Sequence, residues 1–352
     1  MSLTSTISKK EMHEFLKYLS IERALVCPVN TGKVIEFRET LCTESNCDCN
    51  YLSDYCISYK ALKEYYFPQT ELMFTFEGDD VIDNANLPGY AIFGARPCDL
   101  EALRVMSIVY STGKYADPFF QRHFDANFLI GVGCSGLKPE CFCEEMGINK
   151  EFTDFCDVML IDDGDNYTVT HLSEKGEQEL NKFSAQHGKD FCVNKTDEPF
   201  PSQGLSPCPP CPLSLDIDAD DTVYFDVIDW KKVTETCKGC GICTYICPTC
   251  YCFDFKDVSK KDVAERYKCW DSCMYPKFTL HASGHNPREN RHERYRQRVL
   301  HKYKYVPNNF DGAVACTGCG RCVRSCPVGI NIKDILKEVI DKRKCCSNES
   351  TN

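Results

Sequence analysis

Two short cysteine runs constrain this chain more than any other feature. Each has the spacing C-x2-C-x2-C-x3-C-P, first from Cys237 to Pro248 and again from Cys316 to Pro327. This spacing is typical of chains that hold paired [4Fe–4S] clusters. Three thiolates converge on one cubane, and a following helix places the fourth beside the neighbouring cluster. We therefore expect two [4Fe–4S] clusters and a fold in which the two runs interlock.

The same logic assigns the ligands, because the fourth cysteine of each run binds the other cluster in two-cluster ferredoxins. The first cluster is predicted to be held by Cys237, Cys240, Cys243 and Cys326. The second is predicted to be held by Cys316, Cys319, Cys322 and Cys247. Two unrelated zinc sites are the alternative, but zinc usually takes its four ligands as two spaced pairs, which neither run provides.

Cysteine usage also bears on the compartment. The chain has 27 cysteines in 352 residues, which indicates either a disulfide framework in a secreted protein or metal ligation in a reducing compartment. The first twenty residues lack an apolar core of signal-peptide length, and no stretch approaches the ~18 apolar residues of a membrane span. We expect a cytoplasmic protein with no membrane association. The formal net charge of −11 argues against a nucleic-acid partner.

The first half of the chain has the pattern of a mixed α/β domain. Apolar or alternating runs predict strands at 90–96, 128–133, 157–161 and 167–170. A helix-like stretch at 99–110 joins the first two, which makes a βαβ unit. Another helix is predicted to begin at Ser8, because Ser8 and Glu11 have the spacing of a capping box.

Composition then predicts a fold class and domain boundaries. We expect an α/β N-terminal domain followed by a mainly α-helical, ferredoxin-like dicluster C-terminal domain, with a large insertion at 249–315 between the two cluster motifs. The predicted parts are the α/β domain at 1–193, a Pro/Ser/Asp-rich linker at 194–222, the ferredoxin-like domain at 223–346 and a disordered tail at 347–352.

A third group of thiols follows the buried strands of the α/β half. Its members are Cys98, Cys134, Cys141 and Cys143. Because neighbouring parallel strands bring their C-terminal ends to one edge of a sheet, we predict a third [4Fe–4S] cluster there. A packed or zinc-binding site is the alternative. The glycine pattern at 131–136 fits a dinucleotide-binding motif, but Pro139 stands where its helix should continue.

The insertion contains candidates for a tentative further site, which are Cys250, Cys252 and Cys273. A C-x-C pair with a distant thiol can hold a further cluster or a zinc ion. The alternative is that they are packing residues, since free cysteine is among the most buried residue types. Six other cysteines have no role that the sequence assigns: Cys42, Cys47, Cys49, Cys56, Cys208 and Cys211.

Residues 286–304 are rich in arginine and lysine. Such a stretch is typical of a solvated helix face, and that is our prediction. The alternative is that these cations offset the negative charge of the clusters, or that they bind an acidic partner or a flavin phosphate.

Six motifs along the chain together resemble a known family. They are Arg96-Pro-Cys98-Asp99-Leu, Cys141-Phe-Cys143, Cys247-Pro-Thr-Cys250-Tyr-Cys252, Trp270-Asp-Ser-Cys273, Gly284-His285-Asn and Cys316-Thr-Gly-Cys319-Gly-Arg-Cys322. In this order they resemble the iron–sulfur β subunits of sulfhydrogenases and the A subunits of anaerobic sulfite reductase, over nearly the whole chain. The chain departs from this family at 42–56, at 207–212 and at Cys269.

The resemblance implies an electron-transfer subunit. Such a subunit takes electrons from a flavoprotein that oxidises NAD(P)H and passes them to a catalytic subunit, which holds sirohaem in the sulfite reductases and nickel and iron in the hydrogenases. We expect a dissimilatory or anaerobic sulfite reductase complex, with a NiFe (sulf)hydrogenase complex as the alternative.

No catalytic residue of its own is expected in this chain. The sequence shows no nucleophile grouping, no P-loop and no convincing flavin site, so the chemistry is expected to lie in partner subunits. Two other classes remain open. One is a zinc-binding scaffold without a redox role, and the other is a self-sufficient flavin-dependent reductase.

Overall fold

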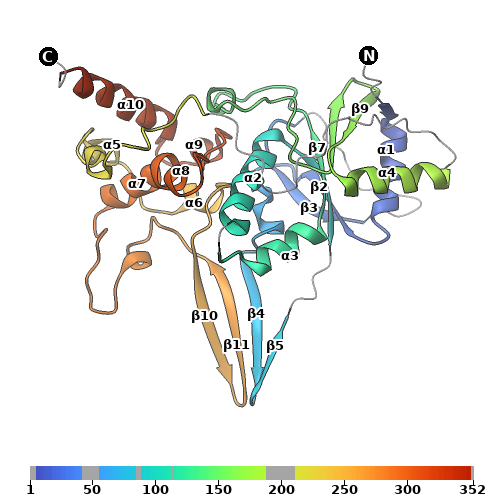
Figure 1. Ribbon diagram of the computed structural model, residues 1–352, viewed down its shortest axis with the longest axis horizontal. Helices are drawn as coiled ribbons and strands as arrows, with labels where there is room; N and C mark the ends of the chain where they lie inside the picture. The colour runs from blue at the N-terminus through green and yellow to red at the C-terminus, as the bar shows by residue number, and fades with distance from the viewer. Residues whose placement is uncertain (1–4, 42–54, 85–88, 113, 188–210, 350–352) are drawn as a thin grey trace. The chain divides into compact units, whose positions relative to one another are not determined.

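The computed structural model describes residues 5–41, 55–84, 89–112, 114–187 and 211–349, with side chains to residue 343. The chain forms two compact units, each assembled from separate stretches (Figure 1). The first unit comprises Met1–Pro68, Asp83–Pro139 and Ile148–Ser206. The second comprises Gln69–Ile82, Glu140–Gly147 and Pro207–Asn352. The division differs from the predicted contiguous domains, because two stretches of the first half pack with the C-terminal half.

The first unit is built on a seven-stranded sheet with the order β1-β9-β8-β7-β6-β2-β3. Its strands are β1 (Ser5–Ser8), β2 (Ala24–Asn30), β3 (Ile35–Thr40), β6 (Tyr90–Ala95), β7 (Phe128–Val132), β8 (Val158–Asp162) and β9 (Asn166–His171). Strands β2, β6, β7 and β8 run parallel, and the outer pairs are antiparallel. The four predicted strands are confirmed.

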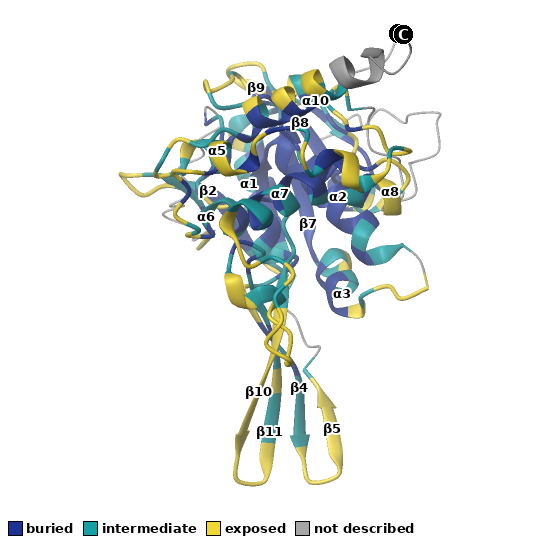
Figure 2. Cartoon of the chain, turned by 90° about the vertical axis from the view of Figure 1, so that its left-hand side faces the viewer, coloured by how far each residue is buried: buried dark blue, intermediate teal, exposed yellow. Residues whose placement is uncertain are grey.

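Four helices accompany this sheet, namely α1 (Lys9–Leu19), α2 (Pro97–Ser111), α3 (Pro118–Ala126) and α4 (Glu174–His187). The predicted capping box is present: the Ser8 hydroxyl accepts from the Glu11 amide, and the Glu11 carboxylate accepts from the Ser8 amide. One face of α1 packs into the core with the parallel strands. Strand β7 is buried along its whole length (Figure 2). Because both of its faces are covered, its sequence is apolar throughout and does not alternate with polar residues.

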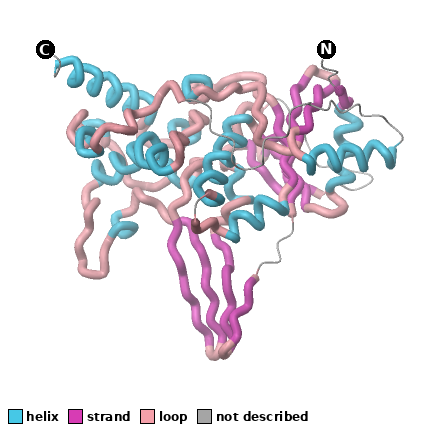
Figure 3. Tube along the Cα trace, in the orientation of Figure 1, coloured by secondary structure: helices cyan, strands magenta, loops and turns pink. Residues whose placement is uncertain are grey.

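The second unit contains a four-stranded sheet in the order β10-β11-β4-β5, whose strands lie side by side (Figure 3). Its strands are β4 (Thr70–Glu77), β5 (Asp80–Asp83), β10 (Phe253–Lys260) and β11 (Val263–Trp270). Hairpin β10–β11 comes from the insertion, and β4 pairs with β11. A buried ion pair between Glu71 and Lys268, 2.8 Å apart, joins the two segments. This pairing explains why 69–82 belongs to the second unit.

The rest of the second unit is mainly helical. Its α-helices are α5 (Trp230–Val233), α6 (Ile242–Tyr245), α7 (Arg291–Leu300), α8 (Val306–Asn309), α9 (Arg321–Arg324) and α10 (Ile332–Glu349). Between α7 and α8 the chain forms a turn of π-helix, η5 (His301–Tyr305). Residues 347–349, predicted to lie in a disordered tail, continue α10. Among the described residues, no helix has the length and apolar character that a bilayer crossing requires.

We expect Ser8→Ala to lower the free energy of unfolding by about 1 kcal/mol, because it removes one half of the capping box. Thermal and urea unfolding followed by far-UV circular dichroism measure the change. Ser8→Thr is the matched control, since it retains a hydroxyl that caps the helix. Equal stabilities of Ser8→Ala and Ser8→Thr would contradict the assigned role of this cap.

Candidate metal centre

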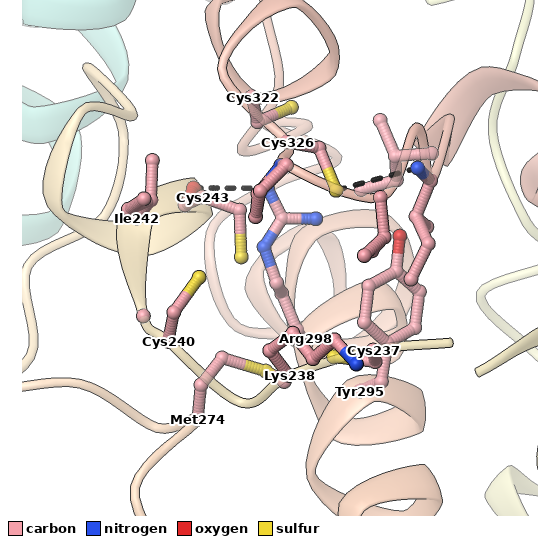
Figure 4. Close-up of a pocket in the computed structure, with 15 residues that line it drawn as sticks. Cys237, Lys238, Cys240, Ile242, Cys243, Met274, Tyr295, Arg298, Cys322 and Cys326 are labelled. Carbon is pink, nitrogen blue, oxygen red and sulfur yellow. Dashed lines mark hydrogen bonds between the residues drawn. The ribbon is translucent and has the colours of Figure 1, made fainter. Parts of the chain in front are cut away.

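The four thiols predicted for the first cluster line one cavity of the second unit (Figure 4). They are Cys237, Cys240, Cys243 and Cys326. The cavity encloses about 460 Å³ that protein atoms do not fill, part of it open to solvent. Its other walls are largely apolar and include Met274, Tyr295 and Ile332. The thiol of Cys326 also accepts a hydrogen bond from the Ile330 amide at 3.3 Å.

A second cavity of about 320 Å³ is lined by the other predicted set, which is Cys316, Cys319, Cys322 and Cys247. Each cavity therefore combines three thiols of one run with the fourth thiol of the other. Cys322 lines both cavities, so the two spaces are neighbours. Helices α6 and α9, which follow the two cysteine loops, pack against each other and bring the runs together.

Glycines in the second run allow a separate segment of chain to approach it closely. Gly318 and Gly320 have φ of 60° and 74°, in the left-handed region that favours glycine. A Cβ atom on Gly318 would lie 2.5 Å from the carbonyl carbon of Phe142. The Phe142 amide donates to the Gly318 carbonyl at 2.8 Å. This contact places the segment that contains Cys141 and Cys143 beside the second run.

Two basic side chains lie inside the protein between and beside the cavities. Arg298 and Lys302 are only 1% and 2% exposed. Arg298 lines both cavities, donates to the Cys243 carbonyl at 3.1 Å, and has its guanidinium between Cys243 and Cys326 (Figure 4). The prediction of a solvated face for 286–304 is wrong for these residues and for Arg294 and Lys304, which are also buried. The burial of Arg298 and Lys302 at the cavities favours the alternative, in which cations offset cluster charge.

The charges in the second cavity are complementary. The pKa of Cys247 is lowered well below its usual range by its contact with Cys250 and by the cations Lys302 and Arg298, although burial opposes the shift. Burial also opposes the charge on Lys302, but the thiols of Cys247 and Cys250 raise its pKa. The site therefore favours a thiolate beside an ammonium, which is the charge state that metal ligation by cysteine requires.

The structure groups the three thiols of the tentative further site. Cys273 is hydrogen-bonded to Cys252, and this contact, with burial and the nearby Cys250, raises the pKa of Cys273. Cys250 is in turn hydrogen-bonded to Cys247 of the second cavity. Among the described residues, no three metal-binding side chains have the tight arrangement that a single ion needs. A metal at this group stays a prediction.

The thiols predicted for a third cluster are divided between the units. Cys98 and Cys134 belong to the first unit, whereas Cys141 and Cys143 belong to the second. In the first unit, the Cys134 thiol lies 3.9 Å from the thiol of Cys56, a residue that the sequence could not place. The four-thiol site stays a prediction, with Cys56 as a neighbour of one of its members.

The buried side chain of Arg96 explains how Cys56 reaches this edge of the sheet. Its guanidinium donates to the carbonyls of Val132, Gly133 and Tyr55, and it stacks on the Tyr55 ring at 4.2 Å. Arg96 thus joins the C-terminal ends of β6 and β7 to the segment before Cys56. The only sequence signal for this arrangement was an arginine directly after a buried strand.

Of the other cysteines without an assigned role, the structure describes Cys211. Burial raises the pKa of Cys211 to about 11, and Cys316 of the second cavity adds to the shift, so Cys211 lies near that cavity. The remaining members of this group, Cys42, Cys47, Cys49 and Cys208, lie outside the described residues.

Comparison with known proteins agrees with this geometry. Residues 236–330 match a family model described as a 4Fe-4S dicluster domain. The chain is therefore similar to a 4Fe–4S dicluster domain over these residues. It is also 29% identical over 305 residues to the Sulfhydrogenase 2 subunit beta of Pyrococcus furiosus, a match that covers 81% of this chain and 84% of that protein. The resemblance to the iron–sulfur β subunits of sulfhydrogenases is therefore confirmed. No solved structure matches the chain.

The predicted fold class is confirmed in its main features. The first unit is a mixed α/β structure, and the match to a 4Fe–4S dicluster domain lies in the C-terminal part of the chain. All eight thiols of the two cavities fall within the matched residues 236–330.

We expect Gly318→Ala to destabilise the dicluster domain more than Gly239→Ala does. Both glycines have positive φ, so either alanine costs about 1–2 kcal/mol of backbone strain. A Cβ on Gly239 has no neighbour closer than 3.9 Å, whereas one on Gly318 would overlap the backbone of Phe142. Urea unfolding measures the difference. Equal losses of stability would contradict the close packing of 140–143 on the second run.

Proposed function

We propose that this chain is the electron-transfer iron–sulfur subunit of a multisubunit oxidoreductase similar to a sulfhydrogenase. One observation supports the proposal above all: eight thiols line two neighbouring cavities, and each cavity includes a thiol from the other run. The first [4Fe–4S] cluster is held by Cys237, Cys240, Cys243 and Cys326. The second is held by Cys316, Cys319, Cys322 and Cys247.

The residues around the cavities fit such clusters. The thiols lie among apolar side chains and backbone amides, and buried cations compensate for the charge of the thiolates. When bound, the clusters supply one-electron transfer. The chain fixes their separation through α6 and α9, and it sets the charge around the clusters through Arg298 and Lys302.

Further clusters are part of the proposal. From the sequence alone we propose a third cluster on Cys98, Cys134, Cys141 and Cys143. We propose a fourth site at Cys250, Cys252 and Cys273. Two contacts support it: Cys273 is hydrogen-bonded to Cys252, and Cys250 is hydrogen-bonded to Cys247 of the second cavity. These thiols extend the relay beyond the dicluster pair.

The proposed partners are a flavoprotein subunit that oxidises NAD(P)H and a catalytic subunit that receives the electrons. The similarity to a sulfhydrogenase subunit from Pyrococcus furiosus favours a hydrogenase-type complex. From the resemblance of the motifs we propose nickel and iron in its catalytic subunit. A sulfite reductase complex with sirohaem is the second candidate, because the motifs of this chain also resemble the A subunits of anaerobic sulfite reductase. We further propose a cytoplasmic location, without a nucleic-acid or membrane partner.

The protein purified without oxygen is expected to contain at least about eight iron atoms, four for each of two clusters. Cys326→Ala should lose about four of them, together with part of the EPR signal of the reduced protein, because it removes one ligand of the first cluster. Iron and sulfide analysis and EPR spectroscopy provide the measurement. Cys27→Ala is the matched control, since Cys27 is a buried thiol in β2 outside every proposed site.

Two results would contradict this function. Zinc in place of iron would indicate a scaffold without a redox role. Bound flavin, with NAD(P)H oxidation by the isolated chain, would indicate a self-sufficient reductase.

The terminal partner is identified by anaerobic purification of the tagged chain from its natural host. A hydrogenase-type complex predicts a co-purifying subunit with nickel, measured by elemental analysis. A sulfite reductase complex predicts instead a subunit with the absorption spectrum of sirohaem. Purification of the chain with neither subunit would contradict both candidates.

A further inference from the structure

The two cavities differ in how their cations contact them. At the second cavity, the Lys302 ammonium lies 3.3 Å from the thiol sulfur of Cys247. At the first cavity, Arg298 and Arg291 donate instead to main-chain carbonyls, those of Cys243 and Cys237. Lys238 also lines this cavity, but it is exposed to solvent. Arg298 lines both cavities, so its charge acts on both. The direct contact of Lys302 is made with a thiol of the second cavity.

The surroundings of Lys302 hold its ammonium at this thiol. Its other hydrogen-bond partners are the Thr249 hydroxyl at 3.0 Å and the Ala315 carbonyl at 2.9 Å. Both partners are neutral, and a buried ammonium needs a compensating negative charge. The Thr249 hydroxyl also donates to the Ala315 carbonyl, at 2.6 Å. These contacts form a small polar network that fixes the cation next to Cys247.

The local helix geometry separates Lys302 from a second buried lysine. Both Lys302 and Lys304 lie in the π-helical turn η5, and both are at most 2% exposed. The Lys304 ammonium donates to the carbonyls of Asp216, Ile217 and Ala219 instead. This turn therefore contains two equally buried lysines. Lys302 contacts a predicted cluster ligand, whereas Lys304 contacts main-chain oxygens and lies 3.8 Å from the Asp221 carboxylate.

We propose that Lys302 raises the reduction potential of the cluster on Cys316, Cys319, Cys322 and Cys247 relative to the cluster on the first cavity. This inference rests on the proposed function, because it requires clusters in both cavities. Reduction adds one negative charge to a cluster, and a fixed cation at a ligand sulfur stabilises that charge where the surroundings are poorly solvated. Net charge and hydrogen bonds to the sulfurs are established determinants of cluster potentials. Lys302 is thus a positioning residue that makes the second cluster the electron acceptor of the pair.

The test is an EPR-monitored redox titration of the full-length chain purified without oxygen. Lys302→Gln removes the charge but keeps a donor for the Ala315 carbonyl. In Lys302→Gln we expect the reduction equilibrium of one couple to become at least tenfold less favourable. Its reduction potential then falls by at least about 59 mV, for a one-electron couple. The other couple should shift less. A Cys319→Ser variant, which alters the spectrum of the second cluster, assigns the shifted couple.

Two further variants separate charge from structure. Lys302→Arg keeps the cation and should titrate close to the unmodified protein. Lys304→Gln removes an equally buried ammonium that contacts carbonyls instead of a thiol, and it should leave both potentials unchanged. If Lys302→Gln loses the second cluster, the potential of that cluster in Lys302→Arg becomes the test. A change of more than tenfold in its reduction equilibrium in Lys302→Arg overturns the inference.

The remaining outcomes are unambiguous. Unchanged potentials in Lys302→Gln, equal shifts of both couples, or the same shift in Lys304→Gln would overturn the role of Lys302 and leave the proposed function intact. An unmodified protein that shows fewer than two couples would instead contradict the proposed function, and that result is visible before any variant is made.

Discussion

The exchange of fourth thiols between the two cysteine runs is the constraint on which the second unit depends. Cys247 can reach the second cavity, and Cys326 the first, only if α6 and α9 lie against each other. The residues between the runs must then leave the cluster region and return to it. They do so through hairpin β10–β11 and the long helical segment that begins with α7. The insertion both starts and ends beside the cavities. It therefore allows the two cysteine runs to exchange their fourth thiols.

Charge explains why that returning segment is so basic. Eight cysteine thiols around two cavities place a large negative charge inside the protein when they act as ligands, and buried charge must be compensated. Helix α7 and η5 provide Arg298 and Lys302 at the cavities, and α7 also contributes the buried Arg294. From sequence alone, alternating basic and acidic residues favour a solvated helix. The prediction was wrong because these cations contact groups that are distant in the sequence, which include the Met274 and Cys243 carbonyls and the Cys247 thiol.

The sequence predicted local structure and ligand grouping better than long-range pairing. The capping box at Ser8, the buried strands β6 and β7, and the grouping of the eight thiols each follow from a local pattern of residue types. The pairing of β4 with β11 does not, because both strands have mixed polar and apolar side chains and lie far apart in the chain. The proximity of Cys56 to Cys134 had only the arginine after β6 as a signal, because it depends on the contact of Arg96 with the Tyr55 carbonyl.

The two cysteine runs have the same spacing, so by themselves they provide two similar cluster sites with no preferred direction of electron flow. Any difference between the sites must come from residues outside the runs. Segment 140–143 packs on the second run, where Gly318 and Gly320 permit its approach. On the first run it is instead the Tyr275 ring that approaches Gly241, and the nearest atom to a Cβ on Gly239 is 3.9 Å away. The insertion places Lys302 at a thiol of the second cavity. The segments added around the repeated motif thus make an internally similar pair unequal, and a relay that joins a donor to an acceptor requires that inequality.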